Sequence, residues 1–318
     1  MLVVLGLAAG VATYFWADSR LDHVDAVSDY GGRPADGPGT NWLLAGSDSR
    51  SKLTPQQAKE YHTGTAAAGS GGTDTIMLLH QGSDGSVLVS IPRDSWVTIP
   101  AYTDSRGVRH PSQQSKINAA YNYGGPRLLV RTVETATGVR VDHYAEVGFA
   151  GVVDVVDALG GLDICLPEAV HDSYSGADLR AGCQTLTGVE TLQLVRTRHA
   201  FASSDFARME NQRRVLAALS KELLSPSTLL NPFTFYPVLS AALNSLSVDK
   251  GTGVPGLVRM GWTLHRAAGS GGTQLTVPTS SNSYLTPTGE SAVLWDSVRA
   301  PALFSEIQND RKITSTSG

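Results

Sequence analysis

Cysteine and charge are both scarce in this sequence of 318 residues, which contains two cysteines and 17% charged residues. It has no Cys/His zinc spacing, no P-loop, no dinucleotide fingerprint and no Ser-His-Asp signature. These absences argue against zinc enzymes, P-loop nucleotide hydrolases, nicotinamide-dependent enzymes and serine hydrolases. Basic residues are not in excess either, since the formal net charge is −4. With no base-stacking platform in view, we expect no nucleic-acid partner.

Hydrophobic residues make up 41% of the chain, enough to bury a large core. Apolar segments with strand character alternate with segments of helical spacing, which predicts a layered α/β domain with a mixed sheet. Strands are expected at 41–46, 73–81, 87–100, near 143–149 and at 273–278. Helices are expected at 126–138, 150–161, 187–199 and 203–224, with a last one near 290–307.

The first sixteen residues carry no charge. As a helix they would be about 24 Å long, short of the roughly 30 Å hydrocarbon core of a bilayer. Tyr14, Phe15 and Trp16 stand where an interfacial aromatic belt would fall. We interpret residues 1–17 as a transmembrane anchor, or as the remaining part of one, with the bulk of the chain outside the cell. A cleaved signal peptide and a buried N-terminal helix are the alternatives.

The segment after this helix, residues 18–40, ends in the Gly/Pro-rich stretch GGRPADGPGT. Its composition predicts an extracytoplasmic linker between the membrane and the domain. The main domain is expected at 41–310, and residues 311–318 are expected to form a polar tail.

Cys165 and Cys183 flank an apparent turn. In an oxidising compartment a disulfide between them would stabilise the fold by about 3 kcal/mol through loop-closure entropy. Two unrelated buried thiols are the alternative. We predict the disulfide, which agrees with export.

Aspartates with neighbouring arginines occur where strands are expected to end. Asp48 precedes Arg50 by two residues, Asp74 opens a strand, and Asp94 follows Arg93 directly. Aspartates in such places are most often turn formers. They can also converge on a hard cation such as Mg²⁺, whose other positions are taken by water or substrate phosphate. Carboxylates, a metal and arginines side by side are suited to phosphoryl transfer.

A second cluster of positive charge lies at 194–214. Arg208 and Gln212 share a helix face, and Arg196 and Arg198 can point the same way only if the chain leaves helical geometry between them. A solvated helix face and an anionic-substrate clamp both fit this spacing.

Other residues of this stretch receive the simpler interpretation. Arg213 and Arg214 are expected to be solvated or to pair with Glu210 and Glu222. His199 is a weak candidate for a general base.

Seven segments together resemble the LytR-CpsA-Psr family, in its actinobacterial form, over roughly residues 41–224. They are GSDSR, TDTIMLL, VSIPRD, KINAAYNYGG, FAGVVDVVDALGGLDICLPEAV, SGADLRAGCQTLTGVETLQLVRTRH and DFARMENQRRVL. The resemblance implies a three-layer α-β-α fold and a membrane-anchored phosphotransferase. Such an enzyme takes a cell-wall glycopolymer from a polyprenyl-pyrophosphate carrier and attaches it to a muramic-acid hydroxyl of peptidoglycan, usually with Mg²⁺ and alternatively with Mn²⁺. Arabinogalactan, teichoic acid and capsule all stay open as the polymer.

The resemblance also implies roles for individual residues. Asp48 and Asp74 would hold the metal, and Asp94 would either orient Arg93 or act as the base. The pyrophosphate and head group would be bound by Arg50, Arg93, Arg196, Arg198, Arg208 and Gln212, and Lys116 and Asn118 match a further family signature.

One position departs from the family. Relatives often read DFxRxxRQ, whereas this chain has Asn211 in place of the second arginine. Either one guanidinium is missing or Arg213 compensates for it. The apolar helix near 150–159 fits the family's lipid-tail tunnel, although such a helix is more often simply core.

Two other functions remain open. The same site with water as acceptor would be a polyprenyl-pyrophosphatase. A non-catalytic regulator that binds polyprenyl phosphates would not require the Asp48/Asp74 pair, and Asn211 keeps that alternative open.

Overall fold

The computed structural model describes residues 2–47, 54–61, 72–197, 204–269 and 271–314. A seven-stranded mixed sheet lies at its centre, in the order β1-β14-β9-β2-β3-β4-β15. Its strands are β1 (Asp22–Val24), β2 (Thr40–Ser47), β3 (Thr73–Gly82), β4 (Gly85–Ile91), β9 (His143–Gly148), β14 (Leu246–Asp249) and β15 (Gly272–Thr276). Strand pairs β1–β14, β9–β2 and β4–β15 are parallel, and β14–β9, β2–β3 and β3–β4 are antiparallel. The α/β prediction with a mixed sheet is confirmed.

The central strands β2 and β3 are apolar on both faces, as expected for a sheet covered on both sides. Successive side chains of a strand point to opposite faces. Leu43 and Leu78 therefore belong to one core cluster and Trp42 and Leu79 to the other, and all four are almost fully buried.

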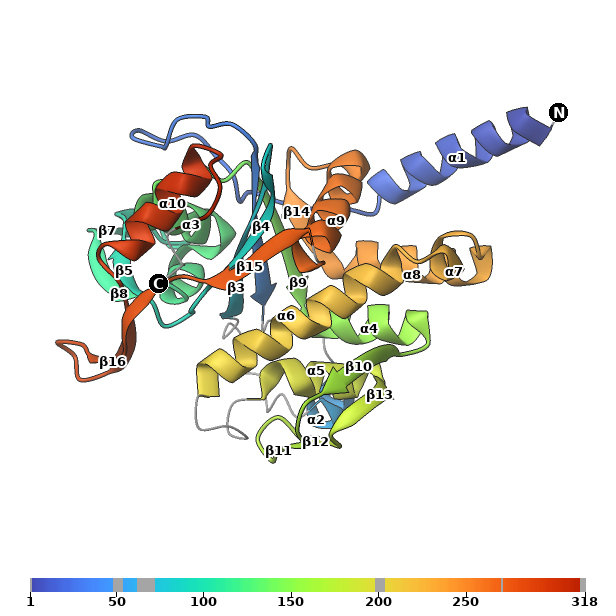
Figure 1. Ribbon diagram of the computed structural model, residues 1–318. Helices are drawn as coiled ribbons and strands as arrows, with labels where there is room; N and C mark the ends of the chain where they lie inside the picture. The colour runs from blue at the N-terminus through green and yellow to red at the C-terminus, as the bar shows by residue number, and fades with distance from the viewer. Residues whose placement is uncertain (1, 48–53, 62–71, 198–203, 270, 315–318) are drawn as a thin grey trace.

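Helices cover each face and give the three layers (Figure 1). The first face packs against α3 (Ala119–Thr137) and α10 (Arg299–Gln308), which contribute Leu129 and Phe304 to its core. The second packs against α8 (Pro232–Ser245) and α9 (Val254–Ala268), which contribute Leu243 and Leu264.

A third cluster lies beside the sheet and joins α4 (Phe149–Leu159), α5 (Gly188–Arg196) and α6 (Ser204–Leu223) to two small hairpins. Helix α4 packs against both α8 and α5, so it is buried on more than one side. The hairpins consist of β10 (Leu162–Leu166) with β13 (Gly182–Leu186) and β11 (Val170–Asp172) with β12 (Ala177–Leu179). Cys165 and Cys183 face each other across β10 and β13 and form the predicted disulfide.

The other elements are short: α2 (Pro55–Glu60), α7 (Pro226–Leu229), β5 (Trp96–Ile99), β6 (Tyr102–Thr103), β7 (Arg109–His110), β8 (Gln113–Lys116), β16 (Thr279–Leu285) and β17 (Ser291–Trp295). Two predicted elements change here. The strand expected at 87–100 is two strands, β4 and β5, because the chain turns at Pro92–Ser95. The helix expected near 290–307 begins as β17, since residues 291–295 pair with β16, and only its second half is helical.

The chain begins with α1 (Leu2–Asp18). Ala17 near its end and Leu21 just after it are buried in the core of the second face. Among the described residues, no helix is both long and apolar enough to cross a bilayer. The membrane anchor stays a prediction.

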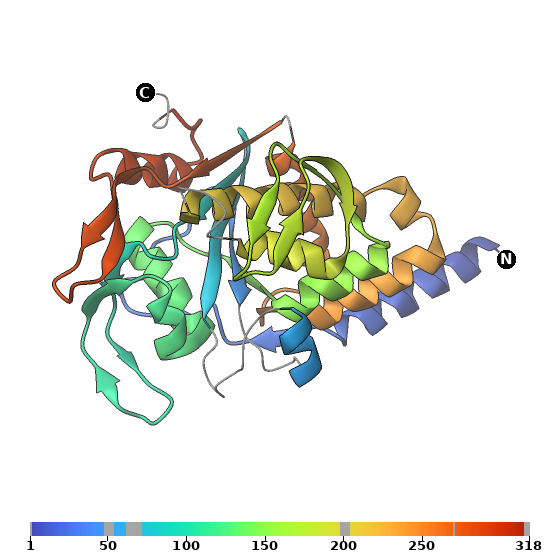
Figure 2. The ribbon, with the colours of Figure 1, turned by 90° about the horizontal axis from the view of Figure 1, so that it is seen from below.

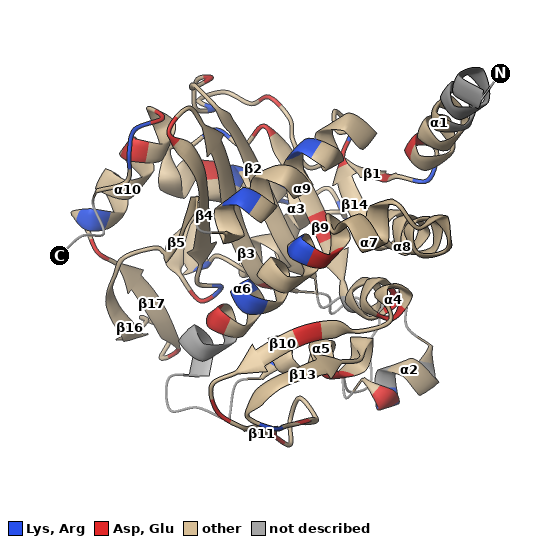
Figure 3. Cartoon of the chain, turned by 45° about the vertical axis from the view of Figure 1, so that its right-hand side comes forward, with Lys and Arg blue, Asp and Glu red and all other residues tan. Residues whose placement is uncertain are grey.

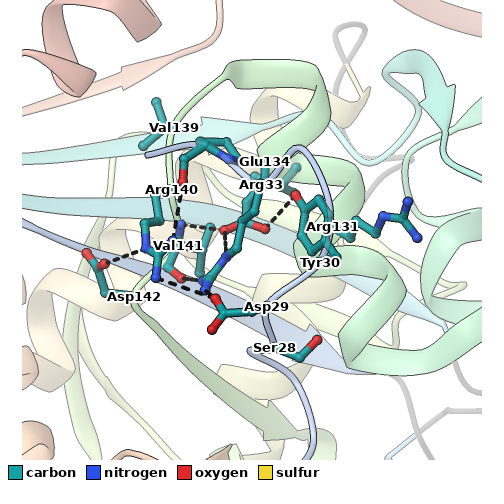
Figure 4. Close-up of polar contacts among 12 residues, drawn as sticks. Ser28, Asp29, Tyr30, Arg33, Arg131, Glu134, Val139, Arg140, Val141 and Asp142 are labelled. Carbon is teal, nitrogen blue, oxygen red and sulfur yellow. Dashed lines mark hydrogen bonds and ion pairs between the residues drawn. The ribbon is translucent and has the colours of Figure 1, made fainter. Parts of the chain in front are cut away.

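Residues 18–40, predicted to be a linker, lie along the domain. Strand β1 joins the sheet edge, and Ala26 is buried in the first core. Tyr30 donates a hydrogen bond of 2.8 Å to Glu134 of α3, and Arg33 donates one of 3.0 Å to the same carboxylate (Figure 4). Because Glu134 is 1% exposed, these bonds satisfy a charge that burial would otherwise penalise, and they fix the segment on the domain.

Candidate active site

A pocket lies where β3 begins and β4 ends. The two strands are antiparallel, and Ile76 lies opposite Ile91. The residues just before Ile76 therefore lie beside the residues just after Ile91. The space between its walls, with the open solvent at its mouth counted, is about 380 Å³, but only about 10 Å³ of it is open to the centre of a water molecule. Its lining consists of Asp74, Thr75, Ile76, Met77, Ser90, Ile91, Pro92, Arg93, Asp94, Met209, Gln212 and Val293.

Arg93 lies between two carboxylates of this pocket. Its Nη1 donates to Asp74, and its Nε lies 3.5 Å from an Asp94 carboxylate oxygen. All three side chains are about one-fifth exposed, at 18–22%. Ion pairs that are partly withdrawn from solvent are screened less than surface pairs. The guanidinium is therefore held in a fixed orientation at the pocket wall.

Asp94 was predicted either to orient Arg93 or to act as a base. One of its carboxylate oxygens faces Arg93, and the other lies 3.8 Å from Nζ of Lys116. Both oxygens thus face cations, an arrangement that fits orientation.

The segment KIN, residues 116–118, which contains the signature residues Lys116 and Asn118, holds the site loop through its backbone as well. The amide of Asn118 donates to the carbonyl of Arg93 at 3.1 Å, and the amide of Ile117 donates to the carbonyl of Ser95 at 2.8 Å. Asn118 is also the N-cap residue of α3, but its side chain makes no capping hydrogen bond. The segment KIN therefore fixes the position of Arg93 and Asp94.

The C-terminal part of the chain holds the same loop from another direction. Val293 of β17 donates its amide to the carbonyl of Asp94 at 2.9 Å, and the indole of Trp295 donates to Ser95 Oγ at 2.8 Å. Glu290 lies 3.8 Å from Lys116. Sequence reasoning missed these contributions, since no pattern in 225–318 links them to residues two hundred positions earlier.

Helix α6 supplies Gln212 and Met209 to the pocket. Gln212 Nε2 donates to the carbonyl of Val195 at 3.4 Å, which joins the pocket to the end of α5. Thr197 follows that end with φ −58° and ψ 127°, so the chain leaves helical geometry there, as a shared direction for Arg196 and Arg198 requires.

Arg196 does not belong to the described lining of the pocket, and its Nη1 donates to the carbonyl of Tyr61 at 2.8 Å. Several other predicted residues cannot be placed. Asp48, Arg50, Arg198 and His199, together with the side chain of Arg208, lie outside the part of the chain that the structure describes.

Arg213 and Arg214 both lie near Glu210, at 3.3 and 3.7 Å, as predicted. For Glu222, the described hydrogen bond comes from Ser225. Asn211 is 3% exposed, and its side-chain oxygen accepts a hydrogen bond of 3.0 Å from Arg214. Asn211 therefore serves the structure of the helix, next to the pocket-lining Gln212.

The described residues contain no group of three acidic, histidine or cysteine side chains that could hold a metal. Mg²⁺ does not require such a group, because it commonly takes one or two carboxylates and keeps waters and substrate phosphates. Asp74 offers one pocket-lining carboxylate, and its predicted partner Asp48 is outside the described residues. The carboxylate of Asp74 is therefore the kind of oxygen ligand that Mg²⁺ prefers.

Comparison with known proteins identifies the same family as the sequence motifs do. The profile of the LytR_cpsA_psr family matches residues 15–298. The probable cell wall biosynthesis protein LcpB of Corynebacterium glutamicum is 40% identical over 308 residues, which cover 96% of this chain and 70% of LcpB. The cell wall biosynthesis protein LcpA of the same organism is 35% identical, and the match covers 86% of this chain but 56% of LcpA.

A more distant relative is the polyisoprenyl-teichoic acid–peptidoglycan teichoic acid transferase TagU of Enterococcus faecalis, 27% identical over 58% of this chain and 57% of TagU. Among solved structures, a LytR-Csp2A-Psr enzyme from Actinomyces oris superposes with a TM-score of 0.66 at 21% identity. That superposition covers 91% of this chain and 96% of the other. This similarity shows the fold.

Proposed function

The chain belongs to the LytR-CpsA-Psr family, and from this membership we propose that it is a cell-wall phosphotransferase. It would move a glycopolymer, as glycosyl phosphate, from a polyprenyl-pyrophosphate carrier to peptidoglycan. The name of TagU describes a transfer from a polyisoprenyl-linked polymer to peptidoglycan, which supports this donor and acceptor. The observation that carries the proposal is the pocket in which Arg93 is held between Asp74 and Asp94.

In the proposed reaction a peptidoglycan hydroxyl oxygen attacks the phosphorus nearer the sugar. A new P–O bond forms, the P–O bond to the bridging oxygen of the pyrophosphate breaks, and polyprenyl phosphate leaves with that oxygen, while the proton of the hydroxyl passes to water. Negative charge grows on the bridging oxygen and the equatorial oxygens. A guanidinium already fixed in place stabilises that charge without reorganising during the step.

The neighbours of Arg93 contribute by position. Asp94 orients the guanidinium, and Lys116 adds positive charge 3.8 Å from Asp94. Gln212 can donate to a phosphate or sugar oxygen from the α6 side of the pocket.

We also propose that Asp74, together with Asp48, binds Mg²⁺ when the donor is present. The ion would supply additional positive charge to the phosphate oxygens. Arg196, Arg198, Arg208 and Arg50 remain proposed ligands of the pyrophosphate. The proposed location is the outer face of a cell membrane, with the N-terminal helix as a single-pass anchor.

The test uses lipid-linked glycopolymer donor with a radiolabelled sugar, incubated with the full chain and Mg²⁺, with and without peptidoglycan. We expect label to enter peptidoglycan and polyprenyl phosphate to be released only when the acceptor is present. Release of equal size without acceptor would replace the transferase by a pyrophosphatase. Donor that binds and survives long incubation would replace it by a binding protein.

A further inference from the structure

A stretch of surface chain carries no charge at all. Residues 223–248 contain no Asp, Glu, Lys, Arg or His, although charged residues make up 17% of the sequence. They form the end of α6, then α7 and α8 and the start of β14. We call α7 and α8 with the turn between them the α7–α8 hairpin. Val238 and Leu243 are buried, and α8 packs against α4, so one side of this hairpin packs against the domain.

The tip of the hairpin faces solvent with large apolar side chains. Leu230 is 81% exposed and Phe233 is 90% exposed, and Leu229 and Tyr236 are exposed as well. Single exposed apolar residues are ordinary on protein surfaces. Four of them within eight residues, with no charge between them, form an apolar patch that indicates an interaction site.

Helix α1, which carries no charge before its last residue, Asp18, runs beside this hairpin. The hydroxyls of Thr13 and Tyr236 share a hydrogen bond of 2.9 Å, and Val11 and Phe15 of α1 are exposed. Both α1 and the α7–α8 tip extend toward the same end of the molecule, seen from two directions (Figures 1 and 2). The coloured charges of Figure 3 are missing from α7 and α8. Two uncharged segments, far apart in sequence, therefore form one end of the protein.

The backbone at the tip is prepared for an apolar environment. Ser225 accepts a hydrogen bond from the amide of Thr228, and Asn231 accepts one from the amide of Phe233. Pro226 and Pro232 occupy the first positions of α7 and α8 and have no amide hydrogen to satisfy. An unsatisfied donor costs several kcal/mol in hydrocarbon, so these caps and prolines lower the cost of burying the tip there.

We propose that the tip, Leu229–Tyr236, inserts into the interfacial region of a lipid bilayer beside α1. Protein–protein interfaces carry a polar, solvent-accessible rim around their core, and neither residues 2–17 nor residues 223–248 carry a charge that could contribute to such a rim. Protruding leucine and phenylalanine, with tyrosine behind them, are the side chains that favour the boundary between head groups and acyl chains. The insertion would fix the orientation of the domain on the membrane, which a single helix alone would not. It does not depend on the transfer reaction.

The experiment places a fluorescent reporter at the tip of the full chain. Both native cysteines form the disulfide, so Phe233→Cys can be labelled with an environment-sensitive dye under non-reducing conditions. Leu285→Cys, at a position 69% exposed on β16, is the matched control. The proteins are added to phosphatidylcholine–phosphatidylglycerol vesicles that contain lipids with a quencher on the acyl chain, and to buffer alone. Circular dichroism checks that each variant is folded.

In vesicles we expect the emission of the dye at position 233 to shift to the blue and to be quenched at least twofold. The dye at position 285 should have the same emission in vesicles as in buffer. A Leu230→Ser/Phe233→Ser variant should abolish the fixed orientation, measured as a change in energy transfer between position 285 and a dye on the membrane surface, because position 285 is then free to approach the membrane. A vesicle-bound protein with unshifted emission at 233, or equal quenching at both positions, would overturn the proposal. So would a shift at 233 that appears in buffer with increasing protein concentration, because it would identify a second copy of the chain as the occupant.

Discussion

The indole of Trp295 donates a hydrogen bond of 2.8 Å to Ser95 Oγ, across two hundred residues of sequence. Ser95 is fully buried, and its hydroxyl in turn donates to the carbonyl of Pro92 at 2.6 Å. The turn that carries Arg93 and Asp94 is thus fixed by the C-terminal hairpin, so the last quarter of the chain belongs to the site.

We therefore expect Trp295→Phe to weaken both stability and activity. The substitution removes the donor and leaves a buried hydroxyl with one partner fewer, at a cost of about 1–3 kcal/mol. Urea unfolding measures the stability, and transfer to peptidoglycan should fall because the loop is less well fixed. Trp262→Phe, at a position 56% exposed, is the control and should change neither quantity. If the two variants behave alike, the hydrogen bond from Trp295 does not support the site.

Arg93→Ala should remove transfer activity and leave the fold intact. Loss of one fixed donor to a developing oxyanion typically lowers kcat by about 10²–10³-fold. Arg93→Lys should recover only part of the activity, because an ammonium cannot contact Asp74 and Asp94 through a planar fork. Initial rates with lipid-linked donor measure both variants. Arg106→Ala is the control, since that side chain is 81% exposed and pairs with Asp104. Full activity in Arg93→Ala would remove this residue from the mechanism.

Most of the fold could be predicted from the sequence because its signals are local. The apolar runs at β2 and β3 and the helical spacing in α5 and α6 each mark their element without reference to the rest of the chain. The strand–helix boundary near 290–307 could not be found in this way. Residues 291–295 are a strand because β16 pairs with them, and that partner gave no recognisable signal of its own.

Some residues of the site could likewise be predicted from local sequence, and others could not. Asp74 and Arg93 could be proposed from their places at strand ends, and pairing of β3 with β4 brings them together. The positions of Lys116 and Glu290 depend on tertiary packing, so their contact with each other could not be read from spacing. Asn211 gives the opposite lesson. Its departure from the family pattern suggests a weakened clamp, whereas its buried side chain bonds to Arg214.

Asn211→Arg, which restores the family pattern, should not raise activity in this chain. Asn211 is 3% exposed, so a longer charged side chain would have to be accommodated in a packed interior. Overpacking alone costs about 1–3 kcal/mol, and an unpaired buried charge adds to it. Thermal unfolding and transfer rates measure the outcome, with Lys221→Arg at an exposed position of the same helix as control. A faster enzyme would mean that the arginine reaches the pocket.

The disulfide should account for a substantial part of the stability of the β10–β13 hairpin. The bonded cysteines are 18 residues apart, and closing a loop of that size contributes about 3 kcal/mol. Dithiothreitol should therefore lower the melting temperature of the wild-type chain. The Cys165→Ser/Cys183→Ser variant should melt at the lowered temperature whether or not reductant is present. A reductant-independent melting temperature in the wild type would contradict this role.

Acid should weaken the fold partly through Asp249. Burial raises the pKa of this carboxyl, but hydrogen bonds from His143, Thr252 and the amide of Tyr144 outweigh that effect together, so the pKa lies below its usual value. Because the folded pKa is the lower one, the stabilisation is fully present above the unfolded pKa of about 3.9 and is lost as the pH falls through the folded value.

Asp249→Asn should therefore lower the free energy of unfolding at neutral pH by about 1–3 kcal/mol. The difference from wild type should shrink as the pH falls below about 4, because the carboxyl then takes up a proton in the unfolded chain before it does so in the folded one. Urea unfolding between neutral pH and pH 3 measures both. Asp178→Asn is the matched control, because Asp178 also contacts a histidine, at 2.6 Å, but is 85% exposed. Its curve should follow that of the wild type, since water screens an exposed pair. Parallel curves for wild type and Asp249→Asn down to pH 3 would show that the buried carboxyl does not link acid to unfolding.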